Sequence, residues 1–207
     1  MIINTNDILS CQFFSEEECK EIIQYIKNKR KFFQQQEYAN LNESNVYNSN
    51  SQITTTLFDK YNFFYDNPQY IDRFVDYLTQ IIPNLQFPIA VQSWVNVYEK
   101  GDGIKPHSHH GLMFHSFAAN IFIGGPTDPG ITYMEPGWKK TIKNQIGCMH
   151  IFDCSLWHTV PPNTSNEPRY SVGITIHSYE ALTKELISGS CSNSNYRDIM
   201  LLTNNHK

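Results

Sequence analysis

The sequence predicts a mainly β domain with flanking helices (α+β), arranged as a sandwich or jelly roll. The first observation is a series of short strands between residues 87 and 178, separated by Gly- and Pro-rich turns such as 124–130. The second is the strict alternation of residues 91–98, which gives a strand with two different faces. The third is a pair of amphipathic helical segments before residue 87. We therefore expect helices packed on one side of a β core.

The first expected helix runs from Glu16 to Lys29. Ser15 and Glu18 have the spacing of a capping box, in which each side chain satisfies the other residue's backbone N–H. One face of this helix is apolar and consists of Cys19, Ile22, Ile23 and Ile26. Residues 34–52 follow, rich in Gln, Asn and Ser and without periodicity, so we expect a loop and regard it as a candidate lid.

The second expected helix begins at Asn67-Pro68 and ends before Pro83. A proline in the first turn costs little, because its missing N–H would have no helical partner there. The apolar stripe consists of Ile71, Phe74, Val75, Leu78 and Ile82. Both helices have the pattern of packing partners for a sheet, and we assign them no chemistry.

The expected strands are short and separated by turns. They cover residues 53–57, 87–98, 117–123, 131–134, 148–152, 158–160 and 170–177, and residues 11–14 form either a further short strand or a hydrophobic staple. In the strand from Phe87, one face carries Val91, Ser93, Val95 and Val97, and the other carries Gln92, Trp94, Asn96 and Tyr98. The first face should meet the helices. The second is polar and aromatic, which suits the lining of a pocket.

We expect one domain covering residues 1–207, since this length supports a single well-buried core. Residues 1–86 form the helical support and lid region, residues 87–178 form the β core, and residues 179–207 form a C-terminal helix and tail. The C-terminal helix is expected over Tyr179–Ile187.

The bulk composition excludes several classes of protein. The formal net charge is −4 and no basic stripe is present, so binding to nucleic acid through phosphate neutralisation is not expected. The five cysteines are odd in number and lack zinc-ribbon spacing, which indicates reduced thiols in a cytoplasmic protein. No apolar run of about 18 residues and no signal-peptide pattern occurs, so we expect no membrane contact. The pattern indicates no particular oligomeric state.

Three histidines form the candidate metal site. His107 and His109 are two residues apart, and alternate side chains of an extended strand point to the same face. His158 lies on a separate expected strand, so a folded sheet could bring it to the same ion. Neutral imidazole binds iron, copper, zinc and nickel, and three protein ligands leave positions open for other molecules. We find no convincing fourth ligand, and the nearby acid Asp102 lies in a turn.

Arg169 supplies a fixed cation beside this site. Alternation places Arg169, Ser171, Gly173 and Thr175 on one face of the last core strand and Val172, Ile174 and Ile176 on the other. A guanidinium group can hold a carboxylate through two hydrogen bonds. Three neutral ligands would leave the charge of the metal uncompensated by protein. We therefore expect an anionic co-substrate.

These residues resemble the 2-oxoglutarate- and Fe(II)-dependent oxygenases, in particular a prolyl-hydroxylase-like branch. Residues 94–102 through His107-Ser108-His109 are similar to the first metal motif of that branch, and residues 117–125 are similar to its next strand and turn. Residues 147–152, His158-Thr159-Val160 and Arg169-Tyr170-Ser171 are similar to its second motif. The resemblance covers about residues 87–178 and includes the order, the spacing and the Arg-x-Ser pattern.

The resemblance implies a double-stranded β-helix (a cupin-like jelly roll) and a hydroxylase that uses Fe(II), 2-oxoglutarate and O2. His107 and His158 would bind iron. His109 stands where the family has Asp or Glu, and it either ligates or leaves a position for water or halide; the bulk of the imidazole favours ligation. Arg169, assisted by Ser171, would bind the distal carboxylate of 2-oxoglutarate. Tyr98 and Asn96 are further candidates for contact with that molecule.

The substrate implied is a peptide or a small molecule, such as a peptidyl or free amino acid like proline. One alternative is a cupin-type metalloenzyme without 2-oxoglutarate: the His-x-His after Gly101 fits its first motif, but the Glu expected soon afterwards is absent. The other alternative is a non-catalytic jelly-roll binding module. Binding of 2-oxoglutarate separates the first alternative from the oxygenase, and metal content separates the second.

Overall fold

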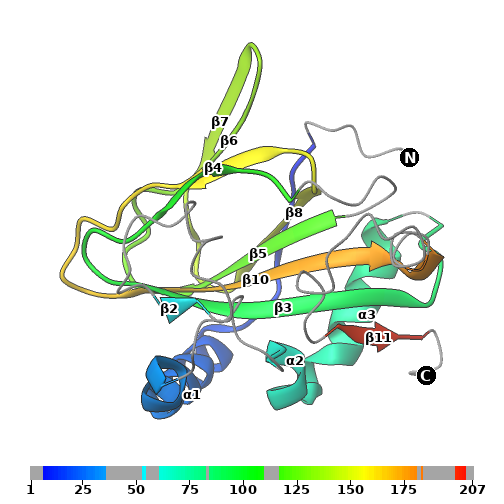
Figure 1. Cartoon of the computed structure of the whole chain (residues 1–207), viewed down its shortest axis with the longest axis horizontal. Helices are drawn as coiled ribbons and strands as arrows, with labels where there is room; N and C mark the ends of the chain where they lie inside the picture. Colours follow the sequence, from blue (N-terminus) through cyan, green and yellow to red (C-terminus); the bar gives the residue numbers. More distant parts are fainter. Residues whose placement is uncertain are drawn as a thin grey trace.

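Two antiparallel sheets face each other, and helices cover the outer side of the larger sheet (Figure 1). The computed structural model describes residues 7–35, 53–54, 61–82, 84–109, 117–180, 183 and 199–203. The three layers are therefore helices, larger sheet and smaller sheet, in that order. The predicted mainly β fold with flanking helices is confirmed.

The larger sheet contains seven strands in the described part of the chain, in the order β1-β8-β5-β10-β3-β11, with β2 also paired with β3. The two longest strands, β3 and β10, pair along their whole length, from Tyr98 opposite Arg169 to Ile89 opposite Ser178. The strands are β1 (Leu9–Gln12), β2 (Ile53–Thr54), β3 (Ile89–Tyr98), β5 (Phe117–Gly124), β8 (Cys148–Asp153), β10 (Arg169–Ser178) and β11 (Met200–Leu202).

The smaller sheet has the order β4-β9-β6-β7. Its strands are β4 (Ile104–His107), β9 (Trp157–Val160), β6 (Ile131–Glu135) and β7 (Trp138–Ile142). The β6–β7 hairpin extends away from the body of the molecule (Figure 1). Strands β4, β9 and the start of β6 cover the inner face of the larger sheet, and the space between the two sheets holds the candidate site.

The helices on the outer face are α1 (Glu16–Gln35), α2 (Phe63–Asp66), a 3-10 turn (Pro68–Tyr70) and α3 (Ile71–Ile81). The predicted capping box at the start of α1 is confirmed. The backbone N–H of Glu18 donates to Ser15 Oγ at 3.1 Å, and the N–H of Ser15 donates to the Glu18 carboxylate at 2.8 Å. Arg73 of α3 also binds this carboxylate with both terminal nitrogens, at 2.9 and 2.7 Å, and so ties α3 to α1.

The two faces of β3 and β10 differ as predicted. The outer face packs on the helices in one large apolar cluster, which includes Val95 and Val97 of β3 and Val172, Ile174 and Ile176 of β10. The inner face carries Trp94, Asn96 and Tyr98 of β3, all of which line a cavity between the sheets. The helices therefore complete the larger hydrophobic core. Between the two sheets, a second and smaller apolar cluster, which includes Tyr98 and Phe152, surrounds the polar groups of the inner face.

Several elements differ from the expectation. Helix α1 continues past Lys29 to Gln35, because no helix-breaking residue intervenes and Phe33 is buried. Strands β1, β2 and β11 come from outside residues 87–178 yet pair with the larger sheet, so the β core is wider than predicted. Strand β7 was not predicted. The candidate lid beyond residue 35 and most of the expected helix Tyr179–Ile187 lie outside the described residues.

No helix in the part of the chain that the structure describes is long and apolar enough to cross a membrane.

Candidate metal centre

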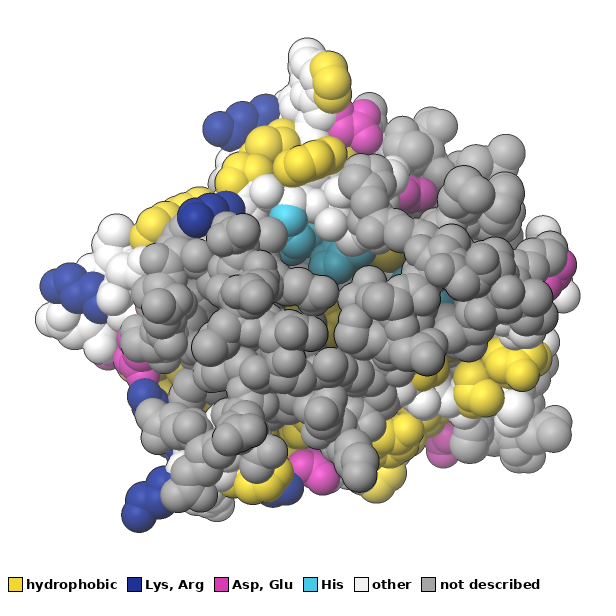
Figure 2. Space-filling model, viewed as in Figure 1, with side chains coloured by type: hydrophobic (Ala, Val, Ile, Leu, Met, Phe, Trp, Pro, Cys, Tyr) yellow, Lys and Arg dark blue, Asp and Glu magenta, His cyan; other side chains and the backbone are white. Residues whose placement is uncertain are grey.

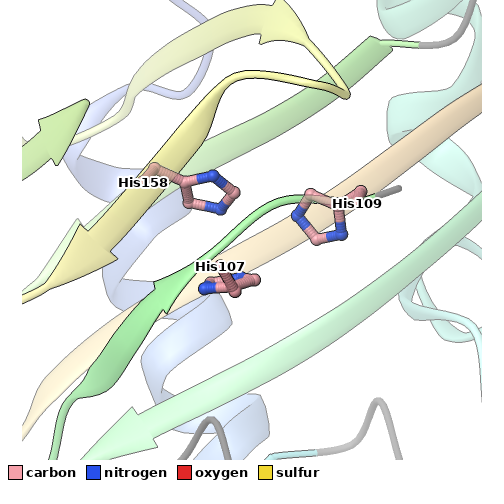
Figure 3. A group of neighbouring side chains, drawn as sticks. All are labelled: His107, His109 and His158. Atoms are coloured by element: carbon pink, nitrogen blue, oxygen red, sulfur yellow. The ribbon is translucent and has the colours of Figure 1, made fainter. Parts of the chain in front are cut away.

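His107, His109 and His158 come together between the two sheets. Their potential ligand nitrogens all lie within 4.8 Å of one another. The three rings surround one space in Figure 3, with His107 from β4, His158 from β9 and His109 just beyond the end of β4. Figure 2 shows histidine side chains in a recess of the surface, below the strands of the smaller sheet. Among the described residues, no Asp or Glu joins this group.

Strand pairing brings the histidines together. His107 lies directly opposite His158 in the β4–β9 pair, so their side chains share one face, and their ring centroids are 4.2 Å apart. His109 is not part of β4, so the expected continuous strand through both residues is wrong. Instead, the backbone N–H of His109 donates to the carbonyl of Cys154 at 2.9 Å, in the turn before β9. This hydrogen bond holds His109 next to β9, so its ring lies beside the rings of His107 and His158.

Two of the rings are oriented by their own backbone. Nδ1 of His107 donates to the carbonyl oxygen of Lys105 at 2.9 Å, and Nδ1 of His158 donates to that of Leu156 at 3.1 Å. A carbonyl only accepts hydrogen bonds, so Nδ1 carries the hydrogen in both rings. The Nε2 atom of each ring then has a free lone pair, which is the form that binds a metal ion.

Burial keeps the three imidazoles neutral. It lowers the pKa of His107, and it lowers the pKa of His158 to about 3, with a further contribution from His107. The pKa of His109 is lowered well below its ordinary value by burial first, and then by His158, His107 and His177. Three neutral rings around one space are compatible with a bound cation. This donor set therefore fits a divalent metal of the kind that imidazole binds.

Asp102 takes no part in this cluster. It is buried, and its carboxylate accepts the backbone N–H of Glu99 at 2.9 Å. Its own carbonyl accepts the N–H of Asn163 at 2.8 Å. Asp102 therefore stabilises the turn after β3. Its place in a Gly-rich stretch of the sequence had indicated such a turn. His110 lies outside the described residues.

The predicted anion-binding residues lie on the inner face of the larger sheet. Arg169 is only 2% exposed; its Nη1 donates to the Pro129 carbonyl at 3.1 Å and its Nη2 to the Pro161 carbonyl at 2.9 Å. Its guanidinium carbon lies 4.9 Å from the centre of the Tyr98 ring. Asn96 donates to Ser171 Oγ at a long 3.5 Å. Two backbone carbonyls and a ring face thus fix the guanidinium.

The cavity beside the histidines is lined by Asn96 and Tyr98 but not by Arg169 or Ser171, which lie next to them. Three other lining residues were not predicted from the sequence: Asn120, Tyr133 and Phe152. The signal available for Tyr133 was the alternation that places it on the same face as Ile131. Trp94 also lines the cavity, as its place on the polar and aromatic face of β3 indicated.

A second pocket, of about 480 Å³, lies at the end of β10. Its wall includes the aromatic residues Phe87, Phe117 and Tyr179, together with Pro88 and His177. His177 is close enough to lower the pKa of His109. The pocket contains none of the three histidines of the cluster, and His177 is its nearest link to them.

No protein-family model matches the chain, and no curated protein matches its sequence. Its fold, however, is that of the double-stranded β-helix oxygenases. A prolyl hydroxylase from Trichoplax adhaerens, solved with a peptide fragment of hypoxia-inducible factor, has a TM-score of 0.64 at 15% identity, covering 88% of each chain.

The viral collagen prolyl hydroxylase of Paramecium Bursaria Chlorella virus-1, solved with 2-oxoglutarate, has a TM-score of 0.59 at 13% identity, covering 86% of this chain and 99% of that one. The epimerase SnoN, solved with Fe3+, alpha-ketoglutarate and nogalamycin RO, has a TM-score of 0.59 at 12% identity, covering 84% and 80%. The predicted double-stranded β-helix is thus confirmed.

Proposed function

We propose that the chain is an Fe(II)- and 2-oxoglutarate-dependent oxygenase that hydroxylates an unactivated C–H bond. The observation that carries this proposal is the neutral three-histidine cluster beside an inner sheet face with a buried guanidinium. Solved structures with the same fold that hold 2-oxoglutarate support it. When bound, Fe(II) and 2-oxoglutarate supply the oxidising chemistry that uses O2.

His107, His109 and His158 would hold the metal through neutral nitrogen atoms. The carboxylate usual in such sites is replaced by His109, so the protein would contribute no negative charge to the ion. An anionic co-substrate would then provide the compensating charge. Tyr133 and Phe152, whose rings pack around His158, would keep bulk water away from the ion.

Arg169 would neutralise the distal carboxylate of 2-oxoglutarate, with Ser171, Tyr98 and Asn96 as further contacts. The guanidinium is well prepared for this role, since the Pro129 and Pro161 carbonyls already fix it and no carboxylate among the described residues forms an ion pair with it. Burial lowers its pKa, which indicates that an anion beside it would be bound favourably.

The substrate would enter from the pocket at the end of β10. This pocket has aromatic and proline walls and contains His177, which interacts with His109. Such a wall suits an apolar side chain or ring, so a peptidyl or free amino acid such as proline remains the proposed substrate class. The reported peptide complex of a protein with this fold supports a peptide.

The test is calorimetric binding of 2-oxoglutarate to protein loaded with Mn(II), which replaces iron without turnover. We expect Arg169→Ala to keep the metal affinity of the wild type and to weaken 2-oxoglutarate binding by about 30-fold or more, because a buried charge pair is lost. Arg169→Lys, which keeps the charge but not the two-pronged geometry, should bind with intermediate affinity. Arg30→Ala, which removes only the ion pair with Glu99 on the outside, is the matched control.

The alternatives predict different results. A cupin-type metalloenzyme would bind Mn(II) but not 2-oxoglutarate. A non-catalytic binding module would bind neither in the wild type. Loss of metal in Arg169→Ala with unchanged 2-oxoglutarate affinity would contradict the roles assigned to both groups.

A further inference from the structure

Strand β7 lies at one edge of the smaller sheet. In the part of the chain that the structure describes, its single neighbour is β6, with which it pairs from Ile131 opposite Ile142 to Glu135 opposite Trp138. The hairpin formed by these two strands extends away from the body of the molecule (Figure 1). An edge strand presents backbone N–H and C=O groups along its outer side, and another extended chain can pair with them.

The hairpin is held in shape by its own contacts. Gly137, in the tight turn between the strands, has φ +78°, a conformation that glycine adopts without strain. The hydroxyls of Thr132 and Thr141 are hydrogen-bonded across the two strands at 2.9 Å. Trp138 and Ile142, the two end residues of β7, pack on the apolar cluster between the sheets. Because β7 is already fixed at both ends, pairing with it costs little ordering of the protein.

Two adjacent lysines occupy the centre of β7. Lys139 and Lys140 are exposed, and neither forms an ion pair among the described residues. Lys139 lies opposite Met134 and Lys140 opposite Tyr133, so the two side chains point to opposite faces of the hairpin. The hairpin contains one acid, Glu135, whereas the whole chain has a formal net charge of −4. The edge is therefore positive on both faces in a chain whose overall charge is negative.

This charge decides which kind of chain pairs with the edge. A second copy of the protein would bring its own β7 lysines against Lys139 and Lys140, and like charges opposite each other destabilise a sheet. A nucleic acid would neutralise the lysines but has no peptide backbone to pair with the N–H and C=O groups of β7. An extended acidic polypeptide satisfies both the lysines and the backbone.

The spacing of the lysines defines the sequence of that polypeptide. Residues directly opposite each other on neighbouring strands share a face. Lys139 and Lys140 are consecutive and point to opposite faces, so the two acids that meet them must also be consecutive. Acids two positions apart would share one face, and only one lysine would then have a partner.

We propose that β7 binds an extended segment of a partner protein that carries two consecutive acidic residues, and that this segment joins the smaller sheet as a further strand. Backbone hydrogen bonds supply the attraction common to any strand, and the two lysines supply the selectivity. The edge lies outside the metal centre and needs neither metal nor 2-oxoglutarate. The inference therefore goes beyond the proposed function and does not rest on it.

The test is an NMR titration of the full chain, without metal, with three synthetic hexapeptides. Thr-Val-Glu-Glu-Val-Thr carries consecutive acids, Thr-Glu-Val-Glu-Val-Thr has the same composition with both acids on one face, and Thr-Val-Lys-Lys-Val-Thr reverses the charge. We expect the first peptide to bind about 3-fold more tightly than the second, because it forms one more charge pair. The third should not bind. Added salt should reduce the difference between the first two.

A charge reversal on the protein gives the complementary result. Lys139→Glu combined with Lys140→Glu should weaken binding of the first peptide about 10-fold, because two attractive pairs become repulsive, and should create binding of the third. Lys27→Glu combined with Lys31→Glu is the matched control, since it changes the net charge equally at exposed positions of α1. It should change neither affinity. All four lysines are exposed, so both double variants should keep the melting temperature of the wild type.

Hydrogen exchange measures the strand addition itself. With the first peptide bound, the backbone N–H groups of β7 that face away from β6 should exchange more slowly. Those of β1, an edge strand of the larger sheet, should exchange at an unchanged rate and serve as the internal control.

Several results would overturn the inference. Equal affinity for the first two peptides would remove the pairing of consecutive acids with the two lysines, and binding without slower exchange at β7 would remove the added strand. Displacement of the first peptide by an oligouridylate at a similar concentration would show a general anion-binding patch. Self-association of the wild type through β7, detected by sedimentation, would assign the edge to a second copy. None of these results bears on 2-oxoglutarate binding, and failure of 2-oxoglutarate to bind would leave this inference intact.

Discussion

The two faces of the larger sheet are buried to the same degree but differ in how fully their groups are satisfied. On β10, Val172 and Ile174 of the outer face are 0% exposed, and Arg169 and Thr175 of the inner face are 2% and 5% exposed. The outer residues are covered by helix side chains in a continuous apolar cluster. The inner face, in contrast, carries polar atoms without partners among the described residues.

This difference separates stability from binding within one strand. Apolar burial stabilises the fold whether or not a ligand is present. Unpaired buried polar atoms cost stability until a ligand supplies their partners. The outer face should therefore account for most of the free energy of unfolding, and the inner face for most of the affinity for a ligand.

The largest effect is expected from neighbouring substitutions on opposite faces. Ile174→Ala removes outer-face packing and should lower the free energy of unfolding by about 2–5 kcal/mol. Thr175→Val, one residue away on the inner face, replaces an unpaired hydroxyl with a methyl group and should leave stability unchanged or slightly higher. Urea unfolding of the protein without ligand measures both. Equal destabilisation by the two variants would break the distinction between the faces.

A smaller effect is expected where the inner face is closely packed. A Cβ atom added at Gly173 would lie 2.5–2.7 Å from the indole of Trp94, whose ring centre is 6.0 Å from that of His109. Gly173→Ala should push the indole into the cavity and lower the free energy of unfolding by about 1–3 kcal/mol. Adding Trp94→Leu should recover part of this loss. Strictly additive effects of the two changes would contradict the contact.

The smallest effect concerns the helix layer and its dependence on pH. The hydrogen bonds from Arg73 lower the pKa of Glu18, with a further contribution from Ser15. The folded state therefore favours the charged carboxylate. Its stabilisation is complete at neutral pH, above the pKa of Glu18 in the unfolded chain, and is lost as the pH falls through the lower folded-state pKa.

Glu18→Gln should remove about 0.5–1 kcal/mol of stability at pH 7 and almost none at the acid end of this range. Unfolding measured against pH in both proteins gives the comparison. Glu17→Gln is the control, because Glu17 makes only a 3.8 Å ion pair with exposed Lys20. Metal or ligand at the inner face should not alter this pH dependence.

Local patterns were sufficient to predict much of the fold. The capping box of α1 depends on residues three apart, and the two faces of β3 and β10 depend on simple alternation. The closeness of the three histidines was predicted, but the spacing argument was right only in part: His107 and His158 meet through strand pairing, whereas His109 lies outside β4 and is positioned by its bond to the Cys154 carbonyl. The capping box and the two strand faces are encoded in residues that lie close together in the sequence.

Strand β11 was missed, and β1 was expected two residues too late, at 11–14, because both depend on distant pairing. Strand β11 pairs with β3 and β1 pairs with β8, and neither segment carries a local signal of its partner. The centre of strand β7 is polar, with Lys139, Lys140 and Thr141 exposed, and only its end residues Trp138 and Ile142 pack on the apolar cluster between the sheets, so its alternation signal is weak. Tyr133 belongs to no motif. Its significance appears only when β6 is placed beside β9.

The carbonyl contacts of His107 and His158 have an evolutionary consequence. In each case the acceptor is the main chain two positions earlier, at Lys105 or Leu156. No replacement of a side chain at those positions removes the acceptor. Substitutions at Lys105 and Leu156 therefore leave the orientation of both imidazoles unchanged. Homologous proteins can replace the surrounding residues, and change their substrates, while these two rings keep the same orientation.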